Sequence, residues 1–241
     1  NHVRCILSDR NGMLWVGTWN GLNTFNPDQT QFTHYKHNST NQTSISSDKI
    51  VNIFEDSDGN IWISTFDGGL NKYDHLSKEF IRYKHNPTDK NSLSNDAVGE
   101  IVEDRKGNLW IATRGDGVNI LDRSRVQFTS LKKTNKEIYS LSDDVIFSIF
   151  KDRTERIWVG TEAAGINIYD PFKRKFNCWR YNKESREGLN NPIVRALCVD
   201  RDSNLWIGTK GGGVNYYDRK PNKFFYYVRN PNNNNSISHN T

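Results

Sequence analysis

The sequence predicts an all-β fold, a β-propeller of four-stranded antiparallel blades, and three observations lead to this prediction. The ten-residue unit from Asp56 to Thr65 returns four more times along the 241 residues. Its tryptophans are spaced by 47, 48, 48 and 48 residues, at Trp15, Trp62, Trp110, Trp158 and Trp206. A phenylalanine also recurs every 48 residues, at Phe32, Phe80, Phe128, Phe176 and Phe224. This period with β patterning is typical of a propeller blade, since horseshoe repeats are shorter and helical repeats show a 3.6-residue pattern.

The first two strands of a blade are expected from apolar runs. In the second repeat these runs are Lys49 to Glu55 and Ile61 to Phe66, as expected of strands covered on both faces. The polar segment Asp56 to Asn60 between them has the composition of a tight hairpin. Glu155 and Ser203 replace the hairpin glycine in two repeats, so we expect those turns to be strained or differently shaped.

The third and fourth strands follow a Gly68-Gly69 corner, at about Leu70 to Asp74 and Phe80 to His85, and the last alternates aromatic and polar residues like an outer strand. The residue two beyond each tryptophan is small and lies on the same strand face, which predicts interdigitation between blades. These small residues are Gly17, Ser64, Ala112, Gly160 and Gly208. The five tryptophans are therefore interpreted as core residues whose indole N–H needs an acceptor.

The domain organisation expected is a single propeller region over residues 1–241. Its blades cover about 1–47, 48–95, 96–143, 144–191 and 192–241. The sequence has no starting methionine, and Ser236 to Asn240 repeats the segment Ser92 to Asp96 that precedes an inner strand, so we expect part of a longer chain. Five blades leave three arrangements open: closure alone, an open arc, or a larger ring completed by another chain.

Composition narrows the function classes. No run is long enough for a membrane span and no leader is visible, which predicts a soluble region without direct membrane contact. The odd number of cysteines, Cys5, Cys178 and Cys198, favours buried thiols over a disulfide framework.

The formal charge of +5 includes basic residues on the outer strands. These residues are interpreted as protection of an exposed strand edge against strand addition, in preference to a nucleic-acid binding surface. No metal spacing, phosphate loop or nucleophile elbow occurs, so neither metal nor cofactor is expected.

The repeat D-x-x-G-x-[LI]-W-[IV]-[GSA]-T, with its Gly-rich corner, resembles the two-component regulator propeller repeat. In the third copy the motif residues are Asp104, Gly107, Leu109, Trp110, Thr113, Gly117, Asn119 and Asp122. The resemblance implies the periplasmic sensor region of a hybrid histidine kinase in the inner membrane. It also implies a following immunoglobulin-like domain, a receptor dimer, an oligosaccharide ligand and a parent ring of about seven blades.

Positions that stay constant in all copies are assigned to the fold. The equivalent carboxylates Asp48, Asp96 and Asp144 share one local sequence and are interpreted as turn formers, because paired catalytic acids need unlike environments. No residue is assigned a catalytic role.

Positions that vary on one rim are the candidate ligand contacts. Directly after the repeated threonine stand Trp19, Phe66, Arg114, Glu162 and Lys210, and the inner strands vary at Arg4, Val51, Gly99, Phe147 and Arg195. Aromatic and charged groups of this kind suit a sugar acid or a sulfated glycan. Solvated residues without a ligand are the competing interpretation for the inner-strand positions.

The leading hypothesis is a non-enzymatic sensor propeller that recognises a glycan-derived oligosaccharide, with acidic sugars among the candidates, and signals through a population shift. A propeller-type polysaccharide lyase or glycosidase and a protein-binding scaffold are the alternatives. Turnover of a charged polysaccharide that Asp96→Asn abolishes favours the enzyme. Binding of a partner protein without any sugar favours the scaffold.

Overall fold

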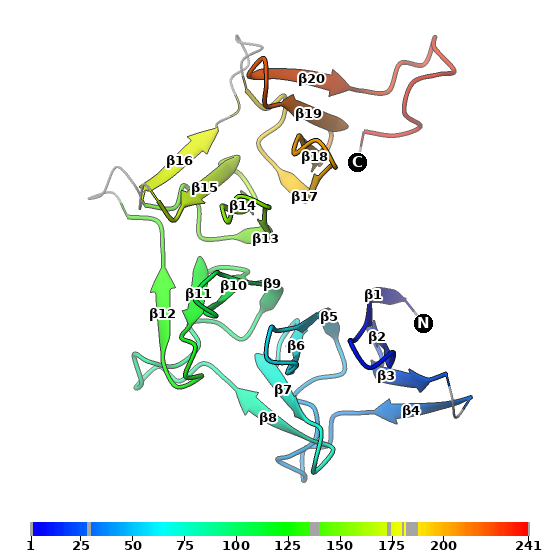
Figure 1. The fold of residues 1–241 in the computed structure, drawn as a ribbon, viewed down its shortest axis with the longest axis vertical. Helices are drawn as coiled ribbons and strands as arrows, with labels where there is room; N and C mark the ends of the chain where they lie inside the picture. Colours follow the sequence, from blue (N-terminus) through cyan, green and yellow to red (C-terminus); the bar gives the residue numbers. More distant parts are fainter. Residues whose placement is uncertain are drawn as a thin grey trace. The chain divides into compact units, whose positions relative to one another are not determined.

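The computed structural model describes residues 2–27, 30–134, 140–172, 175–179, 181 and 188–240. Over these residues the chain forms five four-stranded antiparallel sheets and no helix, which confirms the predicted all-β fold (Figure 1). In each sheet the strand order follows the sequence. No helix in the described part of the chain is long and apolar enough to cross a membrane.

The strands repeat with the period of the sequence. The first sheet contains β1 (Val3–Ser8), β2 (Leu14–Thr18), β3 (Gly21–Asn26) and β4 (Gln31–Tyr35). The second contains β5 (Ile50–Glu55), β6 (Ile61–Thr65), β7 (Leu70–Asp74) and β8 (Glu79–Tyr83). The third contains β9 (Val98–Glu103), β10 (Leu109–Thr113), β11 (Val118–Leu121) and β12 (Phe128–Leu131). The fourth contains β13 (Ile146–Lys151), β14 (Ile157–Thr161), β15 (Ile166–Asp170) and β16 (Lys175–Trp179). The fifth contains β17 (Val194–Val199), β18 (Leu205–Thr209), β19 (Val214–Asp218) and β20 (Lys223–Tyr227).

The chain divides into two compact units, Asn1–Ser130 and Leu131–Thr241. The first unit holds the first three sheets, apart from the last residue of β12, and the second unit holds the fourth and fifth sheets.

The hairpin between the first two strands is organised by its aspartate. Asp56 Oδ1 accepts hydrogen bonds from the backbone N–H groups of Asp58 (3.1 Å) and Asn60 (2.9 Å), and Oδ2 accepts one from Trp62 Nε1 (2.9 Å). The same indole-to-carboxylate bond recurs at 2.8 to 3.2 Å in the other four repeats. The repeated aspartate therefore closes the turn and also satisfies the one polar group of a packed tryptophan.

Glu155 and Ser203 lie in left-handed backbone conformations with φ of 62° and 68°, close to the 80° of Gly12 and Gly107. Their N–H groups donate to the carbonyls of Asp152 (2.9 Å) and Asp200 (3.1 Å), as Gly59 N–H does to Asp56 (3.0 Å). Of the two alternatives expected, strain or a different shape, the structure shows the first: the backbone is left-handed at a residue with a side chain, and the turn keeps the shape of the glycine hairpins. The carboxylate hydrogen bonds hold the same turn even where the residue has a Cβ.

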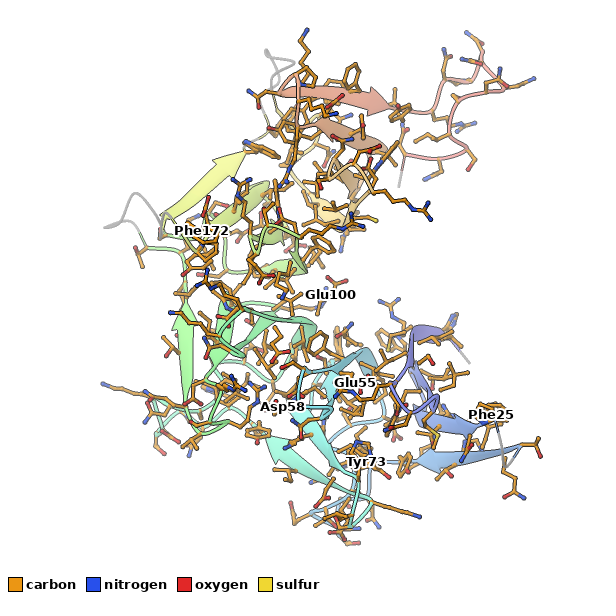
Figure 2. All side chains as sticks on the ribbon, viewed as in Figure 1. Phe25, Glu55, Asp58, Tyr73, Glu100 and Phe172 are labelled. Atoms are coloured by element: carbon orange, nitrogen blue, oxygen red, sulfur yellow. The ribbon has the colours of Figure 1, made fainter. Side chains whose placement is uncertain are left out.

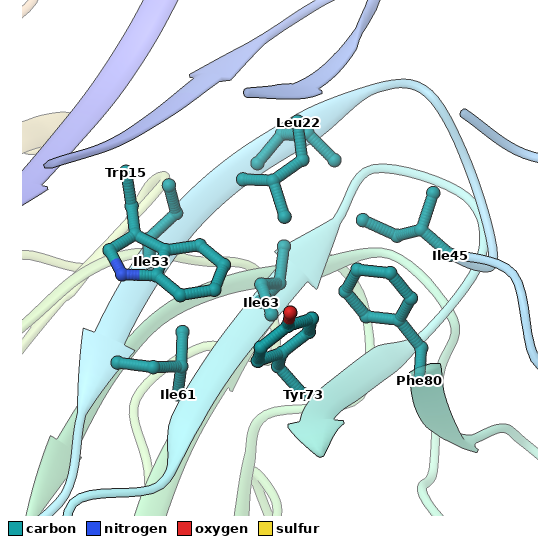
Figure 3. Close-up of a cluster of buried hydrophobic side chains, with 9 residues drawn as sticks. Trp15, Leu22, Ile45, Ile53, Ile61, Ile63, Tyr73 and Phe80 are labelled. Atoms are coloured by element: carbon teal, nitrogen blue, oxygen red, sulfur yellow. The ribbon is translucent and has the colours of Figure 1, made fainter. Parts of the chain in front are cut away.

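The core lies between consecutive sheets within each unit. In the first unit, Trp15 and Leu22 of the first sheet pack on Ile53, Ile63 and other apolar residues of the second sheet (Figure 3). Trp62 packs in the same way on the third sheet, and Trp158 on the fifth. Burial of an inner-strand side chain depends on the preceding sheet. Ile6 of β1 is 63% exposed, whereas the equivalent Ile53 of β5, which packs on the first sheet, is 6% exposed.

The small residues of the second strands make room for the neighbouring sheet. A Cβ on Gly17 would lie 2.6 Å from Ile50 Cγ2, and a Cβ on Gly160 would lie 2.8 Å from Val194 Cγ1. In both cases a β-branched residue of the following inner strand fills the space above the glycine. The interdigitation expected from the sequence is therefore visible at these positions.

The cysteine prediction needs one correction. Cys5 on β1 is partly buried, and burial raises the pKa of its thiol to about 11. Cys198 on β17 is exposed, so the expectation of a buried thiol is wrong there. Its equivalents Leu7, Phe54 and Phe150 pack on a following sheet, whereas β17 belongs to the last sheet of its unit. The side chain of Cys178 lies outside the described residues.

Ion pairs join the hairpins of neighbouring sheets within a unit. Arg10 Nε lies 2.6 Å from Glu55 Oε1, and Arg123 Nη2 lies 3.9 Å from Asp58 Oδ1, with Glu55 and Asp58 labelled in Figure 2. Arg125 Nη2 lies 3.0 Å from Asp56 Oδ2 and its guanidinium lies over the Trp62 ring. Arg219 makes the matching contacts with Asp152 (2.6 Å) and Trp158 in the second unit.

Candidate functional site

The corner between the second and third strands is built by the constant residues. The hydroxyl of the repeated threonine donates to the carbonyl of the corner glycine, as in Thr65 to Gly69 (2.7 Å) and Thr161 to Gly165 (2.8 Å). In the second repeat, Asn71 accepts from Ser46 N (2.9 Å) and donates to Ser46 Oγ (2.7 Å). Threonine and asparagine thus hold the corner against the connection that enters the inner strand, which explains why they recur.

The five variable corner residues occupy equivalent places. The backbone N–H of each donates to the carbonyl of the residue that directly precedes the inner strand, at 2.9 to 3.3 Å. The pairs are Trp19 with His2, Phe66 with Lys49, Arg114 with Ala97, Glu162 with Val145 and Lys210 with Ile193. The frame read from the sequence therefore holds at this rim of both units.

The variable inner-strand positions lie at a β-bulge. The strand register shifts between Val3 and Cys5, and it shifts at the same place in the second, fourth and fifth sheets. Arg4, Val51, Phe147 and Arg195 are the extra residues at these shifts. Since a bulge leaves a residue outside the ladder and redirects its side chain, these positions can differ without disturbing the sheet.

In the first unit the structure brings together three of the predicted site residues. The rings of Trp19 and Phe66 lie 5.5 Å apart, centroid to centroid, and the guanidinium of Arg4 lies 5.8 Å from the Trp19 ring. Trp19 is 42% exposed and Phe66 is 37% exposed, whereas the repeated tryptophans Trp15 and Trp62 of the same two sheets are buried. Two adjacent exposed rings beside a cation form a surface on which an apolar sugar face can stack.

Lys49 completes this aromatic corner and was not singled out from the sequence. Its ammonium lies 5.8 Å from the Phe66 ring and 2.7 Å from Asp67 Oδ2, and Ser47 Oγ donates to Asp67 Oδ1 at 2.6 Å. Partial burial alone raises the pKa of Asp67, but the hydrogen bonds from Lys49 and Ser47 outweigh it and hold the pKa below its usual value. The sequence signal that points to Lys49 is variation, because the residue just before the inner strand differs in every repeat. These residues are His2, Lys49, Ala97, Val145 and Ile193.

The remaining predicted residues are described within their own units. Arg114 in the first unit is half-buried. In the second unit Arg195 is exposed and its guanidinium lies 3.8 Å from the Phe147 ring centroid. Glu162 is half-buried and Lys210 is exposed. The second unit therefore presents a cationic group supported by one ring rather than an aromatic pair.

The repeated carboxylates at the inner-strand entrances serve the fold. Asp48 Oδ1 accepts from His37 N (2.7 Å), Asp96 Oδ1 from His85 N (2.7 Å) and Asp144 Oδ1 from Lys133 N (2.6 Å). Asn240 makes the same bond to Arg229 N (2.6 Å), which shows that the contact does not depend on the charge. Each carboxylate holds the end of the preceding outer strand, in agreement with the interpretation as turn formers.

Two further observations concern the ligand chemistry of the site. Among the described residues no group of three or more histidine, cysteine, aspartate or glutamate side chains is arranged to hold a metal ion. The connections Asn135 to Ser140 and Asn182 to Leu189, which lead into the inner strands of the fourth and fifth sheets, lie mostly outside the described residues.

The comparisons with known proteins agree on the repeat. The family model "Two component regulator propeller" matches residues 1–20, 44–67, 92–115, 140–163 and 188–211. Each matched segment spans the entrance to an inner strand, the tryptophan hairpin and the corner residue. Among curated proteins, none matches the chain.

Solved structures with the same fold include extracellular domains of putative two-component systems. The extracellular domain of a putative hybrid two-component system from B. thetaiotaomicron is 26% identical with a TM-score of 0.72, over 94% of this chain and 31% of that one. Another such domain from the same organism is 24% identical with a TM-score of 0.68, over 100% of this chain and 36% of that one. A virginiamycin B lyase from Staphylococcus aureus is 14% identical with a TM-score of 0.66, over 93% of this chain and 69% of that one, which shows the fold alone. The chain thus spans about a third of the length of these two extracellular domains.

Proposed function

Because this chain belongs to the two-component regulator propeller family, we propose that it is part of the extracytoplasmic sensor region of a hybrid two-component receptor and that it recognises a glycan-derived, acidic oligosaccharide. It acts without turnover, as a binding module. The solved structures that support this role are extracellular domains of putative two-component systems, at up to 26% identity for the hybrid type.

The observation that carries the proposal is the aromatic corner of the first unit, defined as Trp19, Phe66, Arg4 and Lys49. Two exposed rings 5.5 Å apart supply faces for the C–H groups of a sugar ring. Arg4 and Lys49, each 5.8 Å from one of the rings, place positive charge where a uronate or sulfate group would lie. Lys49 shares its charge with Asp67, so Arg4 is the stronger determinant of charge preference.

The proposed signal is a change in the population of two receptor states. In this proposal the receptor is a dimer anchored in the inner membrane. Its propeller lies in the periplasm and is followed by an immunoglobulin-like domain. A ligand on the propeller rim biases the kinase only if it binds one dimer geometry more tightly than the other. Coupling free energies of about 1 to 3 kcal/mol are typical of such linkage and are sufficient for a clear response.

The test is isothermal titration calorimetry of the chain with a panel of neutral, uronate-containing and sulfated oligosaccharides. Trp19→Ala and Phe66→Ala are each expected to weaken binding of an acidic ligand by about tenfold or more, since a stacked ring contributes about 0.5 to 1.5 kcal/mol beyond its buried area. Arg4→Ala is expected to weaken binding of acidic sugars more than binding of neutral ones. Phe225→Ala, which removes an exposed ring on β20 of the second unit, is the matched control.

Arg114→Ala and Lys210→Ala extend the same test to the other corners. Loss of binding in these two variants, with Trp19→Ala unaffected, moves recognition away from the aromatic corner. Binding by the complete extracellular region but not by this chain overturns a site on the rim and places it at another domain.

A further inference from the structure

A lateral groove in the first unit lies outside the rim described so far. We propose that this groove is a second subsite for the same ligand, so that the protein selects long acidic chains over short ones. The proposal rests on the proposed function of the aromatic corner and specifies the length and charge of what binds there.

The groove has a volume of about 220 Å³ and lies between the outer strands of the first two sheets. One wall is the end of β4 with His34 and Lys36, and the other is the start of β8 with Lys78 and Glu79. The connection between the two sheets, through Asn41 and Thr43, closes it. This connection is fixed because Phe80 N donates to Thr43 O (2.8 Å) and Arg82 Nη2 donates to Asn41 O (2.8 Å).

The groove has an aromatic floor and polar walls. Tyr35 and Phe80 line it with their rings 5.3 Å apart in an edge-to-face arrangement, and Phe80 is buried. Thr43 Oγ1 lies 2.8 Å from Asn41 Oδ1 and 3.0 Å from Glu79 Oε1, so its single hydroxyl hydrogen is shared between two acceptors, and Glu79 Oε2 remains an acceptor for a ligand. Since Phe80 is buried, the half-buried Tyr35 is the ring that a ligand can touch, and a ring edged by hydroxyl and carboxylate groups suits a polyhydroxylated sugar.

The charges favour an acidic ligand. Lys36 and Lys78 stand against the single carboxylate of Glu79, so the lining carries an excess of positive charge. Within the described residues no carboxylate forms an ion pair with Lys78, which is exposed. Its ammonium is therefore available for a charge-assisted hydrogen bond to a uronate or sulfate group.

Lys36 connects the groove with the aromatic corner, because it lines the groove and its side chain reaches the corner. Lys36 Nζ donates to Asn20 Oδ1, and Asn20 follows Trp19 in the same corner. Lys36 also lies 3.9 Å from Asp48 Oδ2, at the entrance of the next inner strand. A chain stacked on Trp19 thus has a polar path past Asn20 and Lys36 into the groove, and two linked subsites bind one long ligand more tightly than either binds a short one.

The experiment compares disaccharides and hexasaccharides of uronic acids, with and without sulfate, by calorimetry on the same chain. Wild type is expected to bind an acidic hexasaccharide at least about tenfold more tightly than its disaccharide. Lys78→Asn is expected to remove most of this length preference while leaving disaccharide binding unchanged. Asparagine is chosen because Lys78 has a φ of 59° and Asn222 has a φ of 56° at the equivalent position. Lys90→Asn makes the same chemical change on an exposed loop away from the groove and serves as control.

The outcomes separate this proposal from the proposed function. Equal affinity for both lengths, with both lost in Trp19→Ala, keeps the aromatic corner and overturns the groove subsite. A length preference that Lys78→Asn does not alter overturns the groove subsite as well. Absence of binding for every acidic sugar at both lengths overturns the acidic ligand itself, and with it both proposals. Thermal unfolding of each variant shows whether the fold is retained.

Discussion

The fourth and fifth sheets carry nearly the same repeat in the same unit, yet the same residues are differently buried in the two. Trp158 of β14 is buried against Val194, Leu205 and other residues of the fifth sheet, whereas Trp206 of β18 is half-buried. Phe150 packs into that cluster, and its equivalent Cys198 is exposed. The repeat therefore specifies the strands and hairpin by itself, while the face of each blade is stabilised by a neighbour.

The hairpin aspartates show the same contrast. Asp152 binds Trp158 Nε1 (2.9 Å) and is also reached from the fifth sheet by Arg219 (2.6 Å). The hydrogen bonds described for Asp200 come from its own hairpin, including Trp206 Nε1 at 3.2 Å. Two hairpins of similar sequence are therefore expected to contribute unequally to the unfolding free energy, and variants of the two sheets measure that difference.

The largest difference is expected for removal of the hairpin carboxylate. Asp152→Ala leaves a buried indole N–H and the Arg219 guanidinium without their partner, which costs about 4 kcal/mol of unfolding free energy. Asp200→Ala is expected to cost clearly less, because the half-buried Trp206 has access to water. Urea unfolding followed by tryptophan fluorescence measures both. Equal losses would contradict the view that the neighbouring sheet adds to the strength of the hairpin.

A second difference concerns the small residue of the second strand. Gly160→Ala places a methyl group against Ser148 Oγ of its own sheet and 2.8 Å from Val194 Cγ1 of the fifth sheet, and such overpacking is expected to cost about 2 kcal/mol. Gly208→Ala finds only Ala196 Cβ at 3.5 Å, an ordinary contact, so its unfolding free energy is expected to stay within about 0.5 kcal/mol of wild type or to rise. Urea titrations of the two variants give the comparison directly. A large loss in Gly208→Ala shows instead that the glycine is required by its own sheet.

Much of the fold was predictable because the repeat supplies the same evidence five times. The strand pattern, the tight hairpin and the small residue beside the tryptophan all follow from spacing and residue type. The second role of the aspartate was missed, since spacing alone does not show that an acid six residues before a tryptophan accepts its N–H. Arg125 and Arg219 were also missed, because they stand three residues after Asp122 and one residue after Asp218 and so leave no periodic signal.

The candidate site was predictable in position and less so in composition. The frame placed Trp19 and Phe66 in equivalent corners of successive repeats, and the structure brings their rings together. It did not predict that Arg114 and Glu162 are half-buried, because side-chain direction depends on packing within each corner. The groove with Lys78 and Glu79 was not predicted either, since it is formed where one repeat's connection crosses the next repeat's outer strand.

The ion pair between the two sheets is expected to appear as a pH-dependent difference. Burial alone raises the pKa of Asp152, but hydrogen bonds from Thr154, Trp158 and Arg219 hold it below its usual value. A lowered folded-state pKa stabilises the fold above the unfolded value near pH 4, and the contribution is lost as the pH falls through the folded-state pKa. Arg219→Met raises that pKa, so the variant is expected to be about 1 to 2 kcal/mol less stable at pH 7.

Urea titrations of Arg219→Met between pH 7 and pH 2 measure this effect. The stability difference from wild type is expected to shrink below about pH 4, because the protonated carboxyl of Asp152 no longer attracts the guanidinium. Arg201→Met removes an exposed arginine of the fifth sheet and should show no such convergence. A difference that stays constant down to pH 2 means that Arg219 acts through packing on Trp158 rather than through its charge.

The smallest effect is expected at the two hairpins that lack glycine. Ser203→Gly and Glu155→Gly relieve left-handed conformations of 68° and 62°, and each is expected to gain about 0.5 to 1 kcal/mol once the added freedom of the unfolded chain is subtracted. The gain at Glu155 is slightly smaller, since its carboxylate lies 3.3 Å from the half-exposed Lys151 ammonium. Differential scanning calorimetry measures gains of this size as a higher melting temperature when the unit unfolds in a single cooperative transition. Because backbone strain is local, Ser203→Gly and Glu155→Gly should change the stability of their sheets by similar amounts. The carboxylate and small-residue variants should instead affect the two sheets differently. This contrast assigns the unequal stability of the two sheets to the packed face and not to the turn.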